Sequence, residues 1–263
     1  MNSARKTYII ANWKMNFTPG EASLYLHRLQ SRVEHIPRNI QLVLAPSLIS
    51  LQSLSLQINR RQFKLAAQNF NQNDFGAYTG EVSVMQLRGF IDYAICGHSE
   101  RRYKFHETDK EIGEKVAAAI RNGLTPILCI GETADERKNH ETATAIYAQL
   151  AGGLHNVSEE DISKVIIAYE PVWAISSNKG ARPANPGDIE EATALIRKHI
   201  SRIYGKTTAE EISILYGGSV NKDTAGGFLD VKGVDGLLIG NASLVADSFC
   251  AIIDIAKGKT NER

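Results

Sequence analysis

The sequence predicts an α/β fold, a (β/α)₈ barrel in which eight parallel strands are surrounded by helices, and three observations lead to it. Eight short apolar segments recur along the 263 residues. Most intervals between them carry a helical pattern, and no linker or low-complexity segment interrupts the alternation. Eight such units in a chain of this length fit a single domain spanning residues 1–263. A doubly wound sheet is the alternative, but it rarely needs eight evenly distributed strands.

The expected strands are short and rich in apolar, often β-branched residues, as is typical of strands buried on both faces of a parallel sheet. In chain order they are Tyr8–Asn12, Gln41–Ala45, Lys64–Gln68, Tyr93–Gly97, Thr125–Ile130, Lys164–Tyr169, Ser213–Tyr216 and Gly236–Ile239. The sixth is the clearest, because its apolar run Val165–Ala168 is bounded by polar residues.

Three of the expected helices begin with recognisable capping signals. Thr18–Glu21 combines an N-cap, a proline at the first helical position and a capping-box acid, and Thr108–Glu111 repeats the box. Asn185 and Pro186 open another helix in the same way. The second and third of these helices then present apolar stripes at helical spacing: Ile112, Val116 and Ile120 on the second, and Ile189, Ile196, Ile200 and Ile203 on the third.

Composition excludes several function classes. The formal net charge is +1 and there are no basic runs, which argues against a nucleic-acid partner. No segment has the apolar length of a membrane span, and Tyr8–Trp13 is too short for the core of a secretory signal. Cys96, Cys129 and Cys250 are widely spaced, so we expect a cytoplasmic location and neither a disulfide framework nor a zinc site.

Polar residues of three kinds follow the expected strands, at the end of a barrel where function is usually placed. Lys14 follows the first strand, His98 the fourth and Glu170 the sixth. Glycine turns follow the last two strands, at Gly217–Ser219 and Gly240–Asn241. A lone glutamate is more often a solvated loop charge. One held at the end of a buried strand, within this pattern, suits a general base that works away from water.

Five segments resemble the motifs of the triosephosphate isomerase family, in that family's order and spacing. They are Ala11–Asn16, Cys96–Arg102, Cys129–Glu132, Tyr169–Ile175 and Tyr216–Val220. The resemblance covers essentially the whole chain. It implies a TIM barrel that interconverts dihydroxyacetone phosphate and D-glyceraldehyde 3-phosphate through an enediolate, as an aldose–ketose isomerase of glycolysis and gluconeogenesis. It implies no cofactor, and no metal is expected because no cluster of histidines and carboxylates has ligand spacing.

The resemblance implies catalytic roles for five residues. Glu170 is expected to be the base, and His98 to polarise the carbonyl and exchange protons between the two oxygens. A helix start after His98 would disfavour an imidazolium there. Lys14 is expected to supply positive charge with Glu100 near enough to pair with it, and Asn12 to donate a hydrogen bond to the developing oxyanion. A structural turn cap is the alternative for Asn12.

The substrate phosphate is expected at the glycine turns after the last two strands, where backbone N–H groups can converge. A helix beginning near Ala242 could direct its N-terminus at the same anion. By resemblance, Val172–Ala181 is a lid that excludes water and grips the phosphate. The expected substrate-binding residues are Asn12, Lys14, Ser176, Ser219, Gly240 and Asn241.

The sequence departs from the family's pattern at three places. Ser176–Asn178 stands where Gly-Thr-Gly is usual; the Ser176 N–H is still expected to meet the phosphate, and the rates of lid closure and product release are left open. Asn241 stands where a second glycine is common, and it tolerates a left-handed backbone better than most residues. His106 stands where a small residue is usual, and nothing in the sequence explains it.

The long connection Phe70–Glu81 exceeds what two neighbouring elements need, and long ordered loops are usually functional. By resemblance it inserts into a partner subunit near Lys14, with Thr79 at its tip, so we expect a homodimer. The alternative is a mobile surface loop.

Two other functions stay open at this point. The first is an isomerase of a four-carbon ketose phosphate, for which the altered lid is the only hint. The second is a catalytically silent scaffold barrel, which would have lost catalytic residues. The complete set argues against it: Asn12, Lys14, His98, Glu100 and Glu170 are all present.

Overall fold

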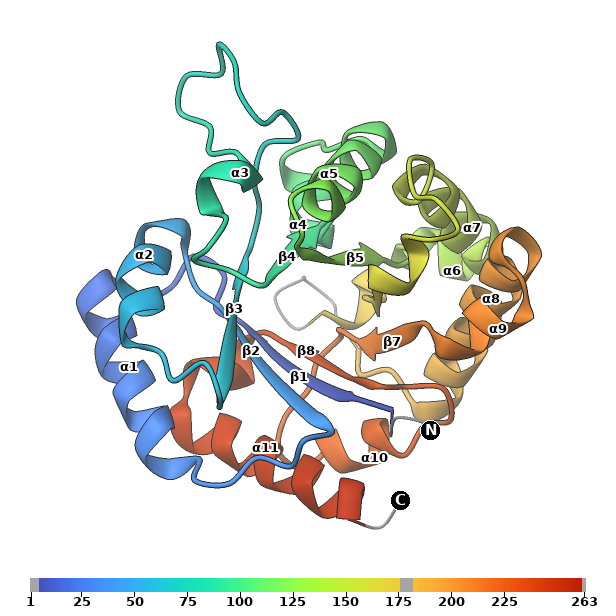
Figure 1. Ribbon diagram of the computed structural model, residues 1–263. Coiled ribbons are helices and arrows are strands. Elements are labelled where there is room, and N and C mark those ends of the chain that lie inside the picture. The colour runs from blue at the N-terminus through green and yellow to red at the C-terminus, as the bar shows by residue number, and fades with distance from the viewer. Residues whose placement is uncertain (1–4, 176–181, 262–263) are drawn as a thin grey trace.

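A computed structural model of the chain describes residues 5–175 and 182–261, in which eight parallel strands form a closed barrel (Figure 1). Each strand pairs with the next in chain order, and β8 closes the barrel against β1. The strands are β1 Thr7–Asn12, β2 Ile40–Ala45, β3 Phe63–Ala67, β4 Tyr93–Cys96, β5 Thr125–Ile130, β6 Ile166–Tyr169, β7 Ser213–Tyr216 and β8 Gly236–Ile239. The predicted fold class is confirmed.

Helices surround the barrel in Figure 1 and connect successive strands. The α-helices are α1 Pro19–Arg32, α2 Leu48–Gln57, α3 Val84–Leu87, α4 Ser99–Lys104, α5 Asp109–Arg121, α6 Ala134–Lys138, α7 Thr142–Gly153, α8 Pro186–Tyr204, α9 Lys206–Glu211, α10 Ala225–Leu229 and α11 Ala246–Asn261. Three short 3₁₀ segments are η1 Ile162–Lys164, η2 Val172–Ala174 and η3 Asn241–Leu244.

Alternation along the strands produces two apolar cores. Ile9 and Ala11 of β1 belong to the larger core, which also contains the inward faces of the helices. Ile10 belongs to a smaller core with Ile127 and Leu215, built from strand residues alone. Successive side chains of a strand point to opposite faces, so the smaller core fills the barrel and the larger one joins it to the helices.

The capping boxes predicted at Thr18 and Thr108 and the helix start predicted at Asn185 are confirmed, and Asn185 also forms a capping box. Thr18, Thr108 and Asn185 each cap a helix through reciprocal side-chain and backbone hydrogen bonds with the residue three positions later. These bonds satisfy N–H groups that have no partner within the helix. The first residues of α1, α5 and α8 are therefore determined by sequence neighbours.

The predicted strand bounds differ from the observed ones by one residue in β1 to β4 and by two residues in β6, and one residue predicted for the inner stripe of α8 is wrong. The sixth strand begins at Ile166, because Lys164 ends the 3₁₀ turn η1. Ile203 does not belong to the inner stripe of α8, since 44% of it is exposed. Tyr204 takes the inward position in the last turn of α8, where its hydroxyl donates to the Leu154 and Val157 carbonyls.

The connection between β3 and α3 projects from the barrel as the teal loop in Figure 1. Phe75 and Tyr78 in this loop are 76% and 47% exposed. In the described part of the chain, no helix is both long enough and apolar enough to cross a membrane.

Candidate active site

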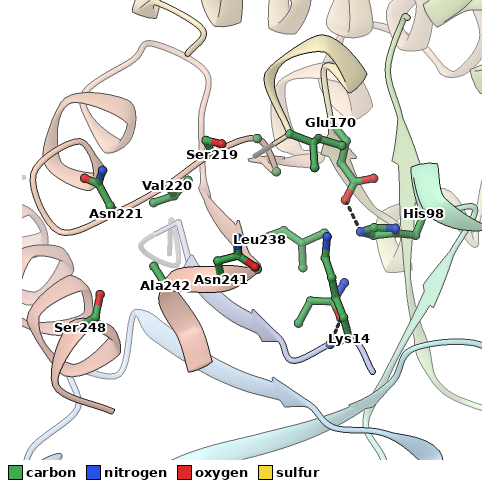
Figure 2. Close-up of a pocket in the computed structure, with 15 residues that line it drawn as sticks. Lys14, His98, Glu170, Ser219, Val220, Asn221, Leu238, Asn241, Ala242 and Ser248 are labelled. Carbon is green, nitrogen blue, oxygen red and sulfur yellow. Dashed lines mark hydrogen bonds and ion pairs between the residues drawn. The ribbon is translucent and has the colours of Figure 1, made fainter. Parts of the chain in front are cut away.

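A cavity of about 470 Å³ lies at the end of the barrel where the strands terminate. Figure 2 shows Lys14, His98 and Glu170 on one side of it and the segments 217–221 and 240–242 on the other. The first side belongs to the ends of β1, β4 and β6, and the second to the ends of β7 and β8. Closure of the barrel thus brings together strand ends that are far apart in the sequence.

Glu170 is held from both ends. Its backbone N–H donates to the Ile130 carbonyl at 2.7 Å, which extends the β5–β6 pairing by one residue. Glu170 as a whole residue is 2% exposed, and its carboxylate oxygen Oε2 accepts the Ser99 N–H at 3.1 Å. Oε1 lies 3.2 Å from His98 Nε2, along the dashed line in Figure 2. The carboxylate is therefore buried and oriented, with partners that carry no fixed positive charge.

His98 is the N-cap residue of α4, and this position determines its tautomer. Its Nδ1 accepts the Glu100 N–H at 3.2 Å, so Nδ1 carries no proton. The ring's remaining proton is then on Nε2, directed at Glu170. The predicted helix start after His98 is confirmed, and a neutral imidazole is the form that the hydrogen bonds favour.

Lys14 pairs with Glu100, as predicted, with Nζ 3.1 Å from Oε1. Burial acts to raise the pKa of Glu100, but the nearby Lys14 ammonium, together with Lys104, outweighs it and lowers the pKa below its usual value. Glu100 therefore stays ionised and neutralises part of the Lys14 charge. Gly240 across the cavity is close as well, because a Cβ added there would lie 3.4 Å from Lys14 Cε.

The backbone of Lys14 is strained and is held by two side chains. Its φ is 52°, a conformation that a non-glycine residue adopts only where its surroundings impose it. Asn12 Oδ1 accepts the Lys14 N–H at 3.1 Å, and Gln68 Nε2 donates to the Lys14 carbonyl at 2.9 Å. Gln68 also donates to the Ala45 carbonyl. Sequence reasoning did not select Gln68, although its position directly after β3 was the available signal.

The glycines after β7 are required by crowding. A Cβ at Gly217 would lie 2.7 Å from Glu170 Cγ, and one at Gly218 would collide with the Tyr216 hydroxyl. Neither glycine has a positive φ. The Ser219 N–H, an expected phosphate donor, donates to the Ala174 carbonyl at 3.1 Å. A phosphate could use this N–H only after Ala174 moves away.

The turn after β8 differs from the sequence prediction in two respects. Among the described residues, the non-glycine positions with positive φ are Lys14, Phe17, His106 and His140. Asn241 therefore does not have a left-handed backbone. The prediction that asparagine replaces glycine there because it tolerates that conformation does not apply. The segment from Asn241 to Leu244 is a 3₁₀ turn, and the longer helix α11 begins only at Ala246. Ser243 closes the turn by donating to the Gly240 carbonyl.

A buried carboxylate that sequence reasoning did not select lies behind Glu170. Glu132 is fully buried and accepts hydrogen bonds from the Tyr169 hydroxyl, Trp173 Nε1 and Arg137 Nη1 at 2.9–3.2 Å. Burial, followed by the Glu132 charge, raises the pKa of the Tyr169 hydroxyl, which stays a donor. The Arg137 and Arg182 guanidiniums contact the Trp173 ring. These contacts anchor the segment that follows Glu170.

Ser176, one of the expected substrate-binding residues, lies outside the described residues, as does most of the expected lid, residues 172–181. Within the described ranges, no group of three or more His, Cys, Asp or Glu side chains is placed to hold a metal ion. The chemistry available at the cavity is thus acid–base and electrostatic: a carboxylate, a neutral imidazole and an ammonium.

The chain is similar to known proteins over nearly its whole length. A family model described as triosephosphate isomerase matches residues 7–256. The triosephosphate isomerase of Caldanaerobacter subterraneus is 40% identical over 251 residues, which is 95% of this chain and 99% of that protein. Those of Cytophaga hutchinsonii and Chlamydia felis are each 43% identical, over 96% and 95% of this chain and 99% and 97% of the relatives.

Proposed function

The chain belongs to the triosephosphate isomerase family, and on that premise we propose how its side chains divide the reaction. It is an isomerase that interconverts triose phosphates. The observation that carries the assignment of roles is the 3.2 Å contact between Glu170 Oε1 and His98 Nε2 at the cavity wall. This contact joins the proposed base to the proposed proton donor.

In the proposed reaction, Glu170 removes a proton from the carbon next to the substrate carbonyl. The C–H electron pair forms a carbon–carbon double bond, and the carbonyl π pair moves onto the oxygen. The product of this step is an enediolate. Glu170 then returns the proton to the neighbouring carbon, which completes the exchange of aldehyde and ketone. Burial of Glu170 supports this role, because a desolvated carboxylate is a stronger base toward a carbon acid than a hydrated one.

His98 is proposed to donate from Nε2 to the oxygen that becomes negative. The hydrogen bond that Nδ1 accepts from Glu100 supports this, since it leaves the only ring proton on the side of the cavity. A neutral imidazole that gives up a proton to one oxygen can take one from the other. Proton exchange between the two oxygens then needs no water.

Lys14 and Asn12 are proposed to stabilise the developing negative charge. The Lys14 ammonium lies between Glu100 on one side and the Gly240 turn on the other, which supports contact with both the enediolate and the phosphate. Preorganised charges of this kind are worth most where water is excluded. Ser219, Gly240 and Asn241 are the proposed phosphate-binding residues, together with Ser176.

A coupled spectrophotometric assay tests the substrate. It compares glyceraldehyde 3-phosphate with a four-carbon ketose phosphate at equal concentrations, with saturating coupling enzyme and no added metal. We expect fast turnover of the triose alone. Preference for the longer sugar would contradict the assignment and favour the alternative isomerase, and inactivity with both would favour a scaffold barrel.

A homodimer is proposed through the loop Phe70–Glu81. The exposed Phe75 and Tyr78 in the projecting loop support it, and so does Met15, which is almost fully exposed beside Lys14. Exposed apolar side chains that gather on one surface often mark a protein–protein interface. Sedimentation velocity should give twice the mass of the chain, and the double variant Phe75→Ser, Tyr78→Ser should give the monomer. A wild-type monomer would refute the proposal.

We propose one domain and a cytoplasmic location for this enzyme. All three cysteines are free thiols, which supports a reducing compartment.

A further inference from the structure

The paired ends of β5 and β6 leave one peptide group without a strand neighbour. Ile130 accepts the Glu170 N–H at 2.7 Å, and Glu132 accepts the Val172 N–H at 3.0 Å. In a parallel pair, the residue between two such acceptors directs its own N–H and carbonyl to the opposite side. That residue is Gly131. On its opposite side, β4 has already ended at Cys96, which pairs with Leu128.

The side chain of Gln149 occupies the place of the missing strand. It lies on α7, is 7% exposed, and contacts both polar groups of Gly131. Its Oε1 accepts the Gly131 N–H at 2.8 Å, and its Nε2 donates to the Gly131 carbonyl at 3.1 Å. A carboxamide has the donor and acceptor arrangement of a peptide group, so it can complete the sheet edge that β4 leaves open.

Gly131 in turn lies directly against the backbone of Glu170. A Cβ added at Gly131 would collide with the Glu170 carbonyl oxygen and lie 2.5 Å from its carbonyl carbon. Interiors packed this closely transmit a displacement from one group to the next. The position of Gly131 therefore sets the position of the Glu170 main chain, from which the carboxylate reaches His98 and Ser99.

We infer that Gln149 is a positioning residue for the reaction: through its two hydrogen bonds to Gly131, it holds the main chain of Glu170 where the carboxylate can reach the substrate carbon. This inference rests on the proposed role of Glu170 as the base. Gln149 itself lies on α7 and does not line the cavity.

The test compares Gln149→Met with a variant of the hydrophobic core that should lower the melting temperature by a similar amount. Met keeps the length of the side chain and removes both hydrogen bonds. We expect kcat to fall at least about tenfold, because misplacing a reacting group by about 1 Å can cost about 10²-fold. KM should stay within about threefold, since the proposed phosphate contacts are on β7 and β8. Ile196→Ala, in the buried face of α8, should lower the melting temperature comparably and leave kcat within about twofold.

Two further variants keep the inference falsifiable if Gln149→Met folds poorly. Gln149→Glu keeps an acceptor for the Gly131 N–H and should lose less kcat than Gln149→Met. Gly131→Ala pushes directly on Glu170, and combining it with Gln149→Met should cost less than the product of the two separate losses, because both act through one displacement. Full additivity, or an unchanged kcat in Gln149→Met, would overturn the inference.

Glu170→Asp in the same assay separates this inference from the proposed function. If Glu170→Asp keeps full turnover, the proposed base is wrong and the role of Gln149 falls with it. If Glu170→Asp loses turnover and Gln149→Met does not, only the positioning role is refuted. A kcat loss in Ile196→Ala equal to that in Gln149→Met would refute it too, since instability alone would then account for the effect.

Discussion

Two buried carboxylates lie at opposite ends of the barrel and have different partners. Asp235 directly precedes β8, at the end where strands begin, and it contacts the guanidiniums of Arg5 at 2.5 Å and Arg197 at 3.4 Å. It also accepts the Ile214 N–H at 2.9 Å. Glu170 follows β6, at the end where strands terminate, and its carboxylate contacts the neutral His98 imidazole, the Ser99 N–H and the Cys129 thiol.

The difference lies in what each carboxylate can still do. Asp235 joins the β7–β8 edge to Arg5 and to α8, and it does not line the cavity. Burial raises the pKa of Asp235, although the Ile214 N–H and the two guanidiniums act to lower it. Among the described residues, no cation contacts the Glu170 carboxylate; it borders the cavity, so a proton can reach it. The charged partners of Asp235 hold it in place and stabilise the fold. The neutral partners of Glu170 leave its carboxylate able to take up a proton at the cavity.

The largest expected effect is at the end with the cavity. Glu170→Asp withdraws the carboxylate by one methylene, and kcat should fall by about 10³-fold, in the range that general-base catalysis contributes. Steady-state kinetics measures this loss, and calorimetry with an unreactive phosphate-bearing analogue of the substrate should find inhibitor binding within about threefold of the wild type. Equal losses of turnover and inhibitor binding would point to a structural role for Glu170 instead.

At the opposite end, Asp235→Ala should reduce stability and leave catalysis alone. Removing one partner of a buried pair costs roughly 3 kcal/mol, because the guanidiniums and the Ile214 N–H lose their acceptor. For a chain of this size the melting temperature should fall by about 6–12 °C. Differential scanning calorimetry measures the shift. A kcat at 25 °C reduced more than about threefold would mean that the two ends are coupled.

A smaller effect is expected where the two walls of the cavity meet. Gly217→Ala places a Cβ 2.7 Å from Glu170 Cγ, so the carboxylate must shift, and kcat should fall about tenfold. Gly227→Ala is the matched control, since nothing lies within 4 Å of its Cβ position in α10. That variant should keep full activity. Equal kinetics for the two alanine variants would contradict the idea that Gly217 is required by crowding.

The smallest effect concerns Glu100, which combines features of both carboxylates: like Asp235 it pairs with a cation, and like Glu170 it lies near the cavity. Its folded-state pKa is lowered, so its pairing with Lys14 contributes stability above the ordinary carboxyl pKa near ~4.3 and is lost as the pH falls through the lower folded value. Because both side chains are partly exposed, the contribution is about 0.5–1 kcal/mol. Urea unfolding at pH 7, 4.5 and 3.5 should show a steeper loss in the wild type than in Glu100→Gln. Parallel curves would show that the pair is energetically neutral.

Features built from sequence neighbours could be predicted. The capping boxes at Thr18, Thr108 and Asn185 depend on hydrogen bonds over three residues, and all three are present. Strand β5 has the predicted bounds, because its apolar run is a local feature of the sequence. The strand-end residues Lys14 and His98 were selected because a parallel barrel places all such ends on one side.

Contacts between residues that lie far apart in the chain were decided only by the tertiary structure. Gln68 reaches Lys14 across 54 positions, and Gln149 reaches Gly131 across 18. No local pattern indicates which glutamine meets which backbone group, because strand stagger and helix packing set the distance. The same holds for Gly217, which is glycine because of Glu170 on the neighbouring strand end. The sequence alone thus determined the barrel and the kinds of residue at its functional end. Closure of the barrel determined how those residues are held, since only the closed sheet brings their supports within hydrogen-bonding distance.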